Sequence, residues 1–292
     1  MVTSLGDAAR AVLTAAAPLE KARLTHLHAA AWADGRLSPD VPTPPPDRPA
    51  RPERPELKLP RDMPKRGRGG NAQNRVALLH ALAHIELNAI DLAWDLVSRF
   101  ADVGMPKGFT DDWVRVADDE ARHFQMLEDR LNALGASYGD LPAHDGLWQS
   151  ATETAHDLAA RLAVVPMVLE ARGLDVTPDT VRRLRAFGDA ESADLLQTIH
   201  DEEIDHVAAG RRWFGHLCAQ RGAEPVALWQ ELVGRHFRGG LKRPFNTASR
   251  LRADFGPEFY EPITPEAPPP PPPSSPSPRP ARPPVDRQPE TR

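Results

Sequence analysis

Two Glu-x-x-His pairs occur within stretches of the sequence whose apolar spacing is helical. Glu120 and His123 form one pair, and Glu203 and His206 form the other. Residues three apart lie on one face of a helix, so each pair can approach a single point. In residues 190–218 the other positions on that face are apolar or small. Carboxylates and imidazoles at this spacing are typical metal ligands, here on a face where a hydrophobic core is expected.

Two further acids occupy comparable apolar faces. Glu86 lies within the helical pattern 72–100, and Glu170 lies within 150–173. An unpaired carboxylate in the core of a helix bundle costs several kcal/mol or takes up a proton instead. No basic residue shares the register of these acids, so we expect a pair of metal cations to balance them. A metal-free buried polar network is the alternative interpretation.

The order of these residues repeats along the chain. Glu120 follows Glu86 by 34 residues, and Glu203 follows Glu170 by 33 residues, which indicates a duplicated helical hairpin. One Glu from each of two helices and a Glu-x-x-His from each of the other two form the site of di-iron carboxylate bundles. The sequence therefore predicts a two-metal site with six ligands: Glu86, Glu120, His123, Glu170, Glu203 and His206.

A third Glu-x-x-His, formed by Glu153 and His156, has another explanation. Ser150 stands three residues before Glu153, which is the spacing of a capping box at a helix start. We therefore interpret Glu153 as a capping residue and not as a metal ligand.

Four charged residues next to the ligands are candidates for an outer shell around the site. Asp119 and Glu202 each precede a paired Glu, and they either form a solvated face or accept a hydrogen bond from a ligand histidine. Arg172 and Asp175 follow Glu170, and they either form a salt bridge in a cleft or end the helix.

The whole chain reads as all-α, with no strand of any quality. Glycine and proline separate the helical patterns, and Pro166 is expected to kink one of them. Thr177 and Pro178 resemble a cap and a first-turn proline, so a short helix over about 178–188 is expected. The long helices are predicted at 8–33, 72–100, 110–134, 150–173 and 190–218.

Proline placement divides the chain into three parts. Of 32 prolines, ten fall in residues 39–64 and fourteen in 262–292. Residues 1–70 are predicted to form a helix and an extended Pro-rich arm that packs on the bundle. Residues 71–260 are predicted to form a four-helix bundle, and 261–292 a disordered polyproline-like tail.

Composition narrows the classes of protein. One Cys excludes a disulfide scaffold, a four-cysteine metal site and a peroxidase with its own rubredoxin-type iron. A net charge of −5 argues against nucleic-acid binding driven by bulk charge, although basic residues outnumber acidic ones in 48–68 and keep tRNA among the possible substrates. No membrane segment or signal peptide is expected, so we predict a cytoplasmic protein.

Several strings resemble a bacterial ferritin-like family catalogued as domain of unknown function 455. They are LLHALAHIELNAIDLAWD (78–95), DDEARHFQMLEDRL (118–131), VPMVLEARGLDVTP (165–178) and IHDEEIDHVAAGRRWF (199–214). The resemblance covers roughly residues 8–260. It implies a ferritin-like four-helix bundle whose two metal ions are held by the six residues named above. The family is also distantly similar to di-iron hydroxylases that modify tRNA.

The donor set contains oxygen and nitrogen but no thiolate, which favours two iron ions, with manganese as the alternative, over structural zinc. We expect an oxidoreductase that activates O2 or peroxide on an unknown substrate, with Glu120 and Glu203 bridging the metals. Ferritin-like iron binding, oxidation or storage is the main alternative, and a metal-stabilised structural protein is a third. No haem, flavin or nucleotide site is visible, so an enzyme would need an external electron donor. A homo-oligomer is compatible with each interpretation.

Overall fold

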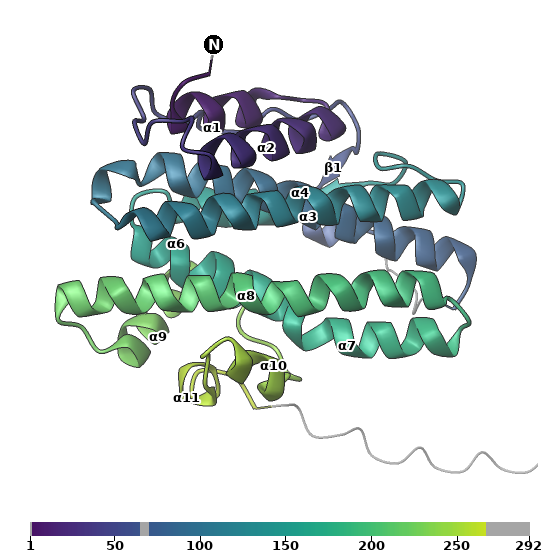
Figure 1. Cartoon of the computed structure of the whole chain (residues 1–292). Helices are drawn as coiled ribbons and strands as arrows, with labels where there is room; N and C mark the ends of the chain where they lie inside the picture. The colour runs from purple at the N-terminus through teal and green to yellow at the C-terminus, as the bar shows by residue number, and fades with distance from the viewer. Residues whose placement is uncertain (1, 65–69, 267–292) are drawn as a thin grey trace, which may run out of the picture.

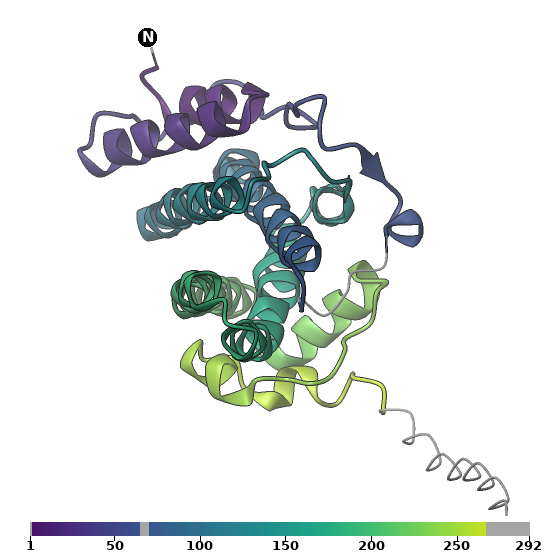
Figure 2. The same ribbon diagram turned by 90° about the vertical axis from the view of Figure 1, so that its right-hand side faces the viewer.

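The chain folds as an all-α helical bundle, which confirms the predicted fold class (Figure 1). The computed structural model describes residues 2–64 and 70–266. Viewed along the long helices, α3 (Ala72–Arg99) and α4 (Lys107–Ala133) form one layer, and α7 (Ala171–Ala186) and α8 (Ala190–Arg221) lie against it (Figure 2). The predicted site residues come from these two layers and from the helical turn that precedes α7.

Three of the predicted long helices occur with nearly the expected bounds, but the N-terminal one is wrong. The stretch 8–33 forms two helices, α1 (Leu5–Thr14) and α2 (Pro18–Ala33). Pro18 has no backbone N–H to extend the first helix, and its fixed φ suits the first turn of a new one. Both helices cover the α3–α4 layer on the side away from α8 (Figure 1).

The predicted helix over 150–173 is wrong at both ends. Helix α5 (Gly146–Glu153) already begins at Gly146 and ends at Glu153, so Ser150 lies inside a helix and caps none. A new helix begins after Asp157, whose side chain accepts a hydrogen bond from the Ala159 N–H. It runs as α6 (Leu158–Val164), a π-helical segment η3 (Val165–Glu170) and α7.

The expected break at Thr177 and Pro178 is also wrong, because α7 continues through Pro178. A proline inside a helix costs about 3 kcal/mol. Burial of Leu174, Val181 and Leu184 in the core compensates for this loss. The continuous helix places Glu170 beside the middle of α8, and no separate connection has to climb the bundle.

Pro166 lies within η3, where the helix widens instead of simply kinking. A proline cannot donate a backbone hydrogen bond, and π-helical turns of this kind are frequent at functional sites. Gly210 of α8 faces Pro166 so closely that a Cβ at position 210 would overlap the proline ring. The glycine thus lets α8 approach the turn that carries Glu170.

The remaining elements wrap the bundle. The arm after α2 includes β1 (Leu57–Lys58) and the 3₁₀ turn η1 (Pro60–Asp62). Strand β1 pairs in parallel with β2 (Ala143–His144), so two short strands occur where none was expected. A second 3₁₀ turn, η2 (Ala101–Val103), joins α3 to α4. Three helices that the sequence did not predict lie on the α7–α8 side of the bundle (Figure 1): α9 (Pro225–His236), α10 (Thr247–Arg252) and α11 (Pro257–Tyr260).

The tail predicted for 261–292 lies outside the described residues from position 267 onward. By length and composition alone, α3 could cross a membrane, although 67% of its most apolar window is buried inside the bundle. The core helix of a soluble protein has this property.

Candidate metal centre

Three helices direct carboxylates and imidazoles toward one point in the bundle. Glu86 comes from α3, Glu120 and His123 come from α4, and Glu203 comes from α8. One ligand atom from each of these four residues lies within 4.8 Å of the others. The helices that surround them are apolar on the same faces, so the cluster lies inside the core. The cluster fits the binding of a metal ion.

His206 of α8 extends this cluster, and two carboxylates stand between the imidazoles. The Nδ1 atom of His123 lies 3.6 Å from Glu120 Oε2 and 3.8 Å from Glu203 Oε1. The Nδ1 atom of His206 lies 3.1 Å from Glu120 Oε1 and 3.5 Å from Glu203 Oε2. Each carboxylate therefore turns one oxygen toward each histidine, and Glu86 Oε2 lies 3.7 Å from His123 Nδ1 alone.

Six buried atoms of the predicted ligands lack hydrogen-bond partners among the described residues. They are Glu120 Oε1 and Oε2, Glu203 Oε2, Glu170 Oε2, His123 Nδ1 and His206 Nδ1. Buried polar atoms are nearly always hydrogen-bonded in folded proteins, so a group of unpaired atoms needs an explanation. Cations shared among these donors would satisfy all of them at once. The residues present thus fit a metal site.

Other buried acids of the bundle are neutralised without a metal. Asp91 on α3 is fully buried, pairs with Lys21 at 2.5 Å and also pairs with Arg51. Asp95, one turn further, pairs with Arg161 at 2.7 Å. Within the described residues, the four glutamates of the centre have no Lys or Arg partner. The same helix therefore carries two acids with protein counter-charges and one without.

Glu170 completes the predicted ligand set but lies outside the tightest group. It projects from the end of η3, and the charges on Glu203 and Glu120 affect its carboxyl group. Burial, together with those charges, raises its pKa well above the ordinary value. The structure thus brings Glu170 to the edge of the cluster formed by the other five residues.

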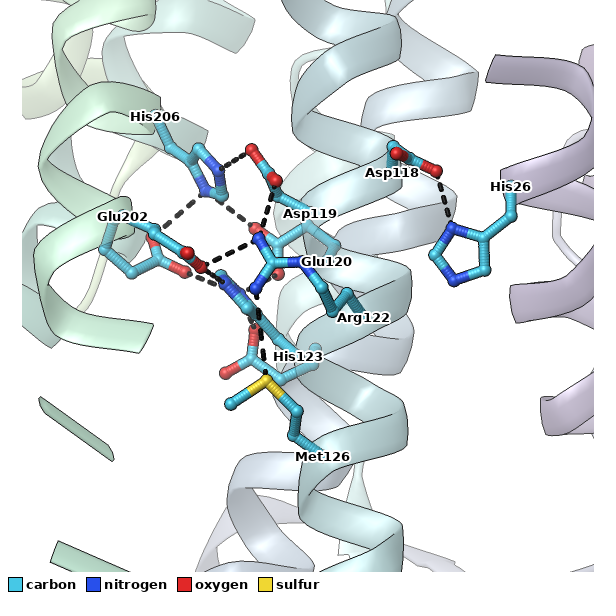
Figure 3. Close-up of polar contacts among 11 residues, drawn as sticks. His26, Asp118, Asp119, Glu120, Arg122, His123, Met126, Glu202 and His206 are labelled. Carbon is cyan, nitrogen blue, oxygen red and sulfur yellow. Dashed lines mark hydrogen bonds and ion pairs between the residues drawn. The ribbon is translucent and has the colours of Figure 1, made fainter. Parts of the chain in front are cut away.

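Each histidine is held from behind by a carboxylate of the opposite helix (Figure 3). His123 Nε2 lies 2.6 Å from Glu202 Oε2, and His206 Nε2 lies 3.3 Å from Asp119 Oδ2. With Nε2–H donating outward, each ring presents Nδ1 to the cluster. Of the two interpretations that the sequence left open, the positions of Asp119 and Glu202 fit the outer shell.

The other two candidates for the outer shell lie elsewhere. Arg172 Nη1 donates to the carbonyl oxygens of Lys242 and Pro244, at 2.8 and 3.1 Å. Asp175 forms a two-pronged ion pair with Arg250 and lies 3.6 Å from Arg172. These side chains line a pocket of about 230 Å³ beside the C-terminal segment. No hydrogen bond or ion pair between them and the predicted ligands occurs in the described residues.

Burial and mutual contact set the protonation of the cluster. Burial raises the pKa of Glu86 well above its ordinary value, and the charge on Glu120 adds to this shift. Burial disfavours the charged form of His123, but Glu120 and Glu86 outweigh it and raise the pKa of His123 to about 11. Against burial, nearby carboxylates also raise the pKa of His206 well above its usual value. Close contacts with Glu86, His123 and His206 hold the pKa of Glu120 well below its ordinary value despite burial.

The third Glu-x-x-His lies apart from the centre. Glu153 accepts a hydrogen bond from Gln149 of its own helix, and the ring of His156 packs against His236 at 5.5 Å. The group of described residues that could hold a metal ion includes neither one. Glu153 does not form the predicted capping box, and the third Glu-x-x-His is not part of the cluster.

Comparison with known proteins assigns the family. A family model described as a protein of unknown function (DUF455) matches residues 14–261. The chain belongs to the DUF455 family. It is 40% identical over 204 residues to an uncharacterized protein of Haemophilus influenzae, an alignment that covers 68% of this chain and 70% of that protein. No solved structure matches this DUF455 chain significantly.

Proposed function

We propose that this DUF455 protein is a ferritin-like di-metal oxidoreductase that uses iron or manganese to activate O2 or peroxide. The observation that carries the proposal is the placement of Glu120 and Glu203, each of which turns one oxygen toward each imidazole. Glu120 and Glu203 would hold two ions together with both histidines, Glu86 and Glu170. The all-oxygen and nitrogen donor set suits iron or manganese.

The bound metals would supply the electrons and the Lewis acidity for reduction of O2 or peroxide. The protein would contribute a site that excludes water, because Glu120, His123 and His206 are fully buried. Glu202 and Asp119 would hold the imidazoles with Nδ1 inward. A separate reductase would return the metals to the reduced state, and the compartment of action would be the cytoplasm.

Anaerobic reconstitution with Fe(II), followed by exposure to O2, tests this proposal. We expect two iron ions per chain, one round of oxidation in the absence of a reductant, and an absorption change in the visible range. Uptake of many more ions per chain would favour iron storage instead.

Three variants make the experiment specific. Glu120→Ala and Glu203→Ala should abolish binding of the iron pair. Glu153→Ala is the matched control, because Glu153 belongs to a Glu-x-x-His motif away from the centre. If neither core variant changes iron binding, the cluster is not the metal site, and a metal-free polar core is the better description.

A further inference from the structure

Arg122 joins the two carboxylates that support the histidines (Figure 3). Its Nη2 atom lies 2.8 Å from Asp119 Oδ1 and 2.9 Å from Glu202 Oε2. The other oxygen of Asp119 accepts from His206, and Glu202 Oε2 also accepts from His123. One guanidinium thus lies at the middle of a continuous hydrogen-bonded chain that runs from one imidazole to the other.

This chain crosses between the two halves of the predicted site. Arg122, Asp119 and His123 lie on α4, whereas Glu202 and His206 lie on α8. We propose, on the basis of the proposed di-metal function, that Arg122 is a positioning residue that fixes both imidazoles together and so couples the two metal positions. Removal of Arg122 would then weaken both positions, whereas loss of one carboxylate would weaken one.

The exposure of these groups favours a positioning role over a stabilising one. The side chain of Arg122 is 40% exposed, and those of Asp119 and Glu202 are 23% and 34% exposed. Ion pairs at this exposure contribute little to the free energy of folding. Their geometric effect is larger, because two carboxylates that share one nitrogen donor would repel each other and turn toward water without it.

The fixed direction of both rings depends on these contacts. On the inner side of each ring, Nδ1 forms no well-directed hydrogen bond in the described structure and only lies 3.1 to 3.8 Å from carboxylate oxygens. The outer hydrogen bond at Nε2 is a further constraint on the ring, and Arg122 holds both acceptors in place. Partners of this kind typically change metal affinity by about 10- to 100-fold.

Arg212 provides a matched control. It pairs with Asp112, so it also links α8 to α4 through an arginine–carboxylate contact. Its side chain is 55% exposed, and within the described residues no hydrogen bond or ion pair joins it to His123 or His206. Any effect of losing a cross-helix ion pair in general should therefore appear in Arg212→Met as well.

Calorimetric titration of the apo protein with Zn²⁺ tests the coupling, since Zn²⁺ binds imidazole and carboxylate and is diamagnetic. Arg212→Met should bind two ions with the same affinities as wild type. Arg122→Met should lose about 10- to 100-fold in affinity at both positions. Asp119→Asn and Glu202→Gln should each lower the affinity for one ion more than the affinity for the other.

Nitrogen-15 NMR of the histidine rings in the Zn²⁺-loaded proteins gives a readout that folding alone would not change. In wild type both Nε2–H protons should exchange slowly with water, and in Arg122→Met both should exchange rapidly. Arg122→Lys retains the charge and should restore part of the affinity. If Arg122→Met does not fold, Arg122→Lys provides the test. A point charge in place of the planar guanidinium should still lower both affinities relative to Arg212→Met.

Equal affinities and exchange rates in the Arg122 variants and Arg212→Met would overturn the role of Arg122. A loss confined to one ion would overturn the coupling. If wild type binds no ion at all, the metal centre itself is refuted, and the inference falls with it.

Discussion

Metal binding should displace about one to four protons from the centre at pH 7.5. In the metal-free protein, burial and neighbouring charges raise the pKa values of Glu86 and Glu170, which shifts both carboxyl groups toward their protonated forms. The pKa of His123, about 11, keeps this imidazole charged, and the raised pKa of His206 shifts the second imidazole in the same direction. Two divalent ions would bind these four residues in their deprotonated forms, so each residue that carries a proton would give it up.

The number of protons released distinguishes this buried cluster from glutamate and histidine side chains with ordinary pKa values. Glutamate and histidine with unperturbed pKa values of about 4.3 and 6.5 would together release only about 0.2 protons at pH 7.5. The direction of each shift also sets the pH dependence. Because all four pKa values are raised, protons compete with the metal over a wider pH range, and the overall affinity for two ions should rise with pH by about one to four orders of magnitude per unit.

Titration calorimetry in several buffers measures the release directly. The observed binding enthalpy changes with the ionisation enthalpy of the buffer, and the slope gives the number of protons exchanged. A slope between about one and four is expected with Zn²⁺ or anaerobic Mn²⁺ at pH 7.5. A slope below about one would refute the assignment of protons to these four residues, even if two ions bind.

Three further outcomes follow from the packing and charges. Asp91→Ala should lower the free energy of unfolding by about 3–5 kcal/mol in a urea titration, because it leaves Lys21 buried without its carboxylate; a loss below 1 kcal/mol would contradict this. Gly210→Ala should cost about 1–3 kcal/mol because its Cβ would overlap Pro166, whereas Gly234→Ala, with open space around it, should not lower the melting temperature. Chelation of the bound metal should lower the free energy of unfolding by about 2.7 kcal/mol, relative to protein with free metal at about one hundred times Kd. Differential scanning calorimetry measures this change, and an unchanged stability would argue against a core site.

Local patterns predicted the helices that carry most of the centre. The apolar spacing around Glu86, Glu120 and Glu203 follows one helical face, and long uninterrupted helices impose that spacing on the sequence. The register placed the five residues of the cluster on inward faces. Glu170 was harder to place, because the π-helical segment around Pro166 shifts the face on which the following residues lie.

Contacts between distant segments could not be read from periodicity. Arg122 stands three residues after Asp119, a spacing visible in the sequence, but its contact with Glu202 spans 80 positions. The pairing of Asp91 with Lys21 spans 70 positions. Proline signals misled at Pro178, where burial of the flanking apolar residues outweighs the lost backbone hydrogen bond.

The counter-charges of Asp91 have a consequence for biosynthesis. Lys21 and Arg51 leave the ribosome well before Asp91, and α1 and α2 have no apolar layer to cover until α3 and α4 have been made. Residues 5–51 must therefore wait for the bundle before they dock. Chaperones that hold exposed apolar segments would meet these residues before α3 and α4, and a truncated protein that begins at α3 would expose the surface that they cover.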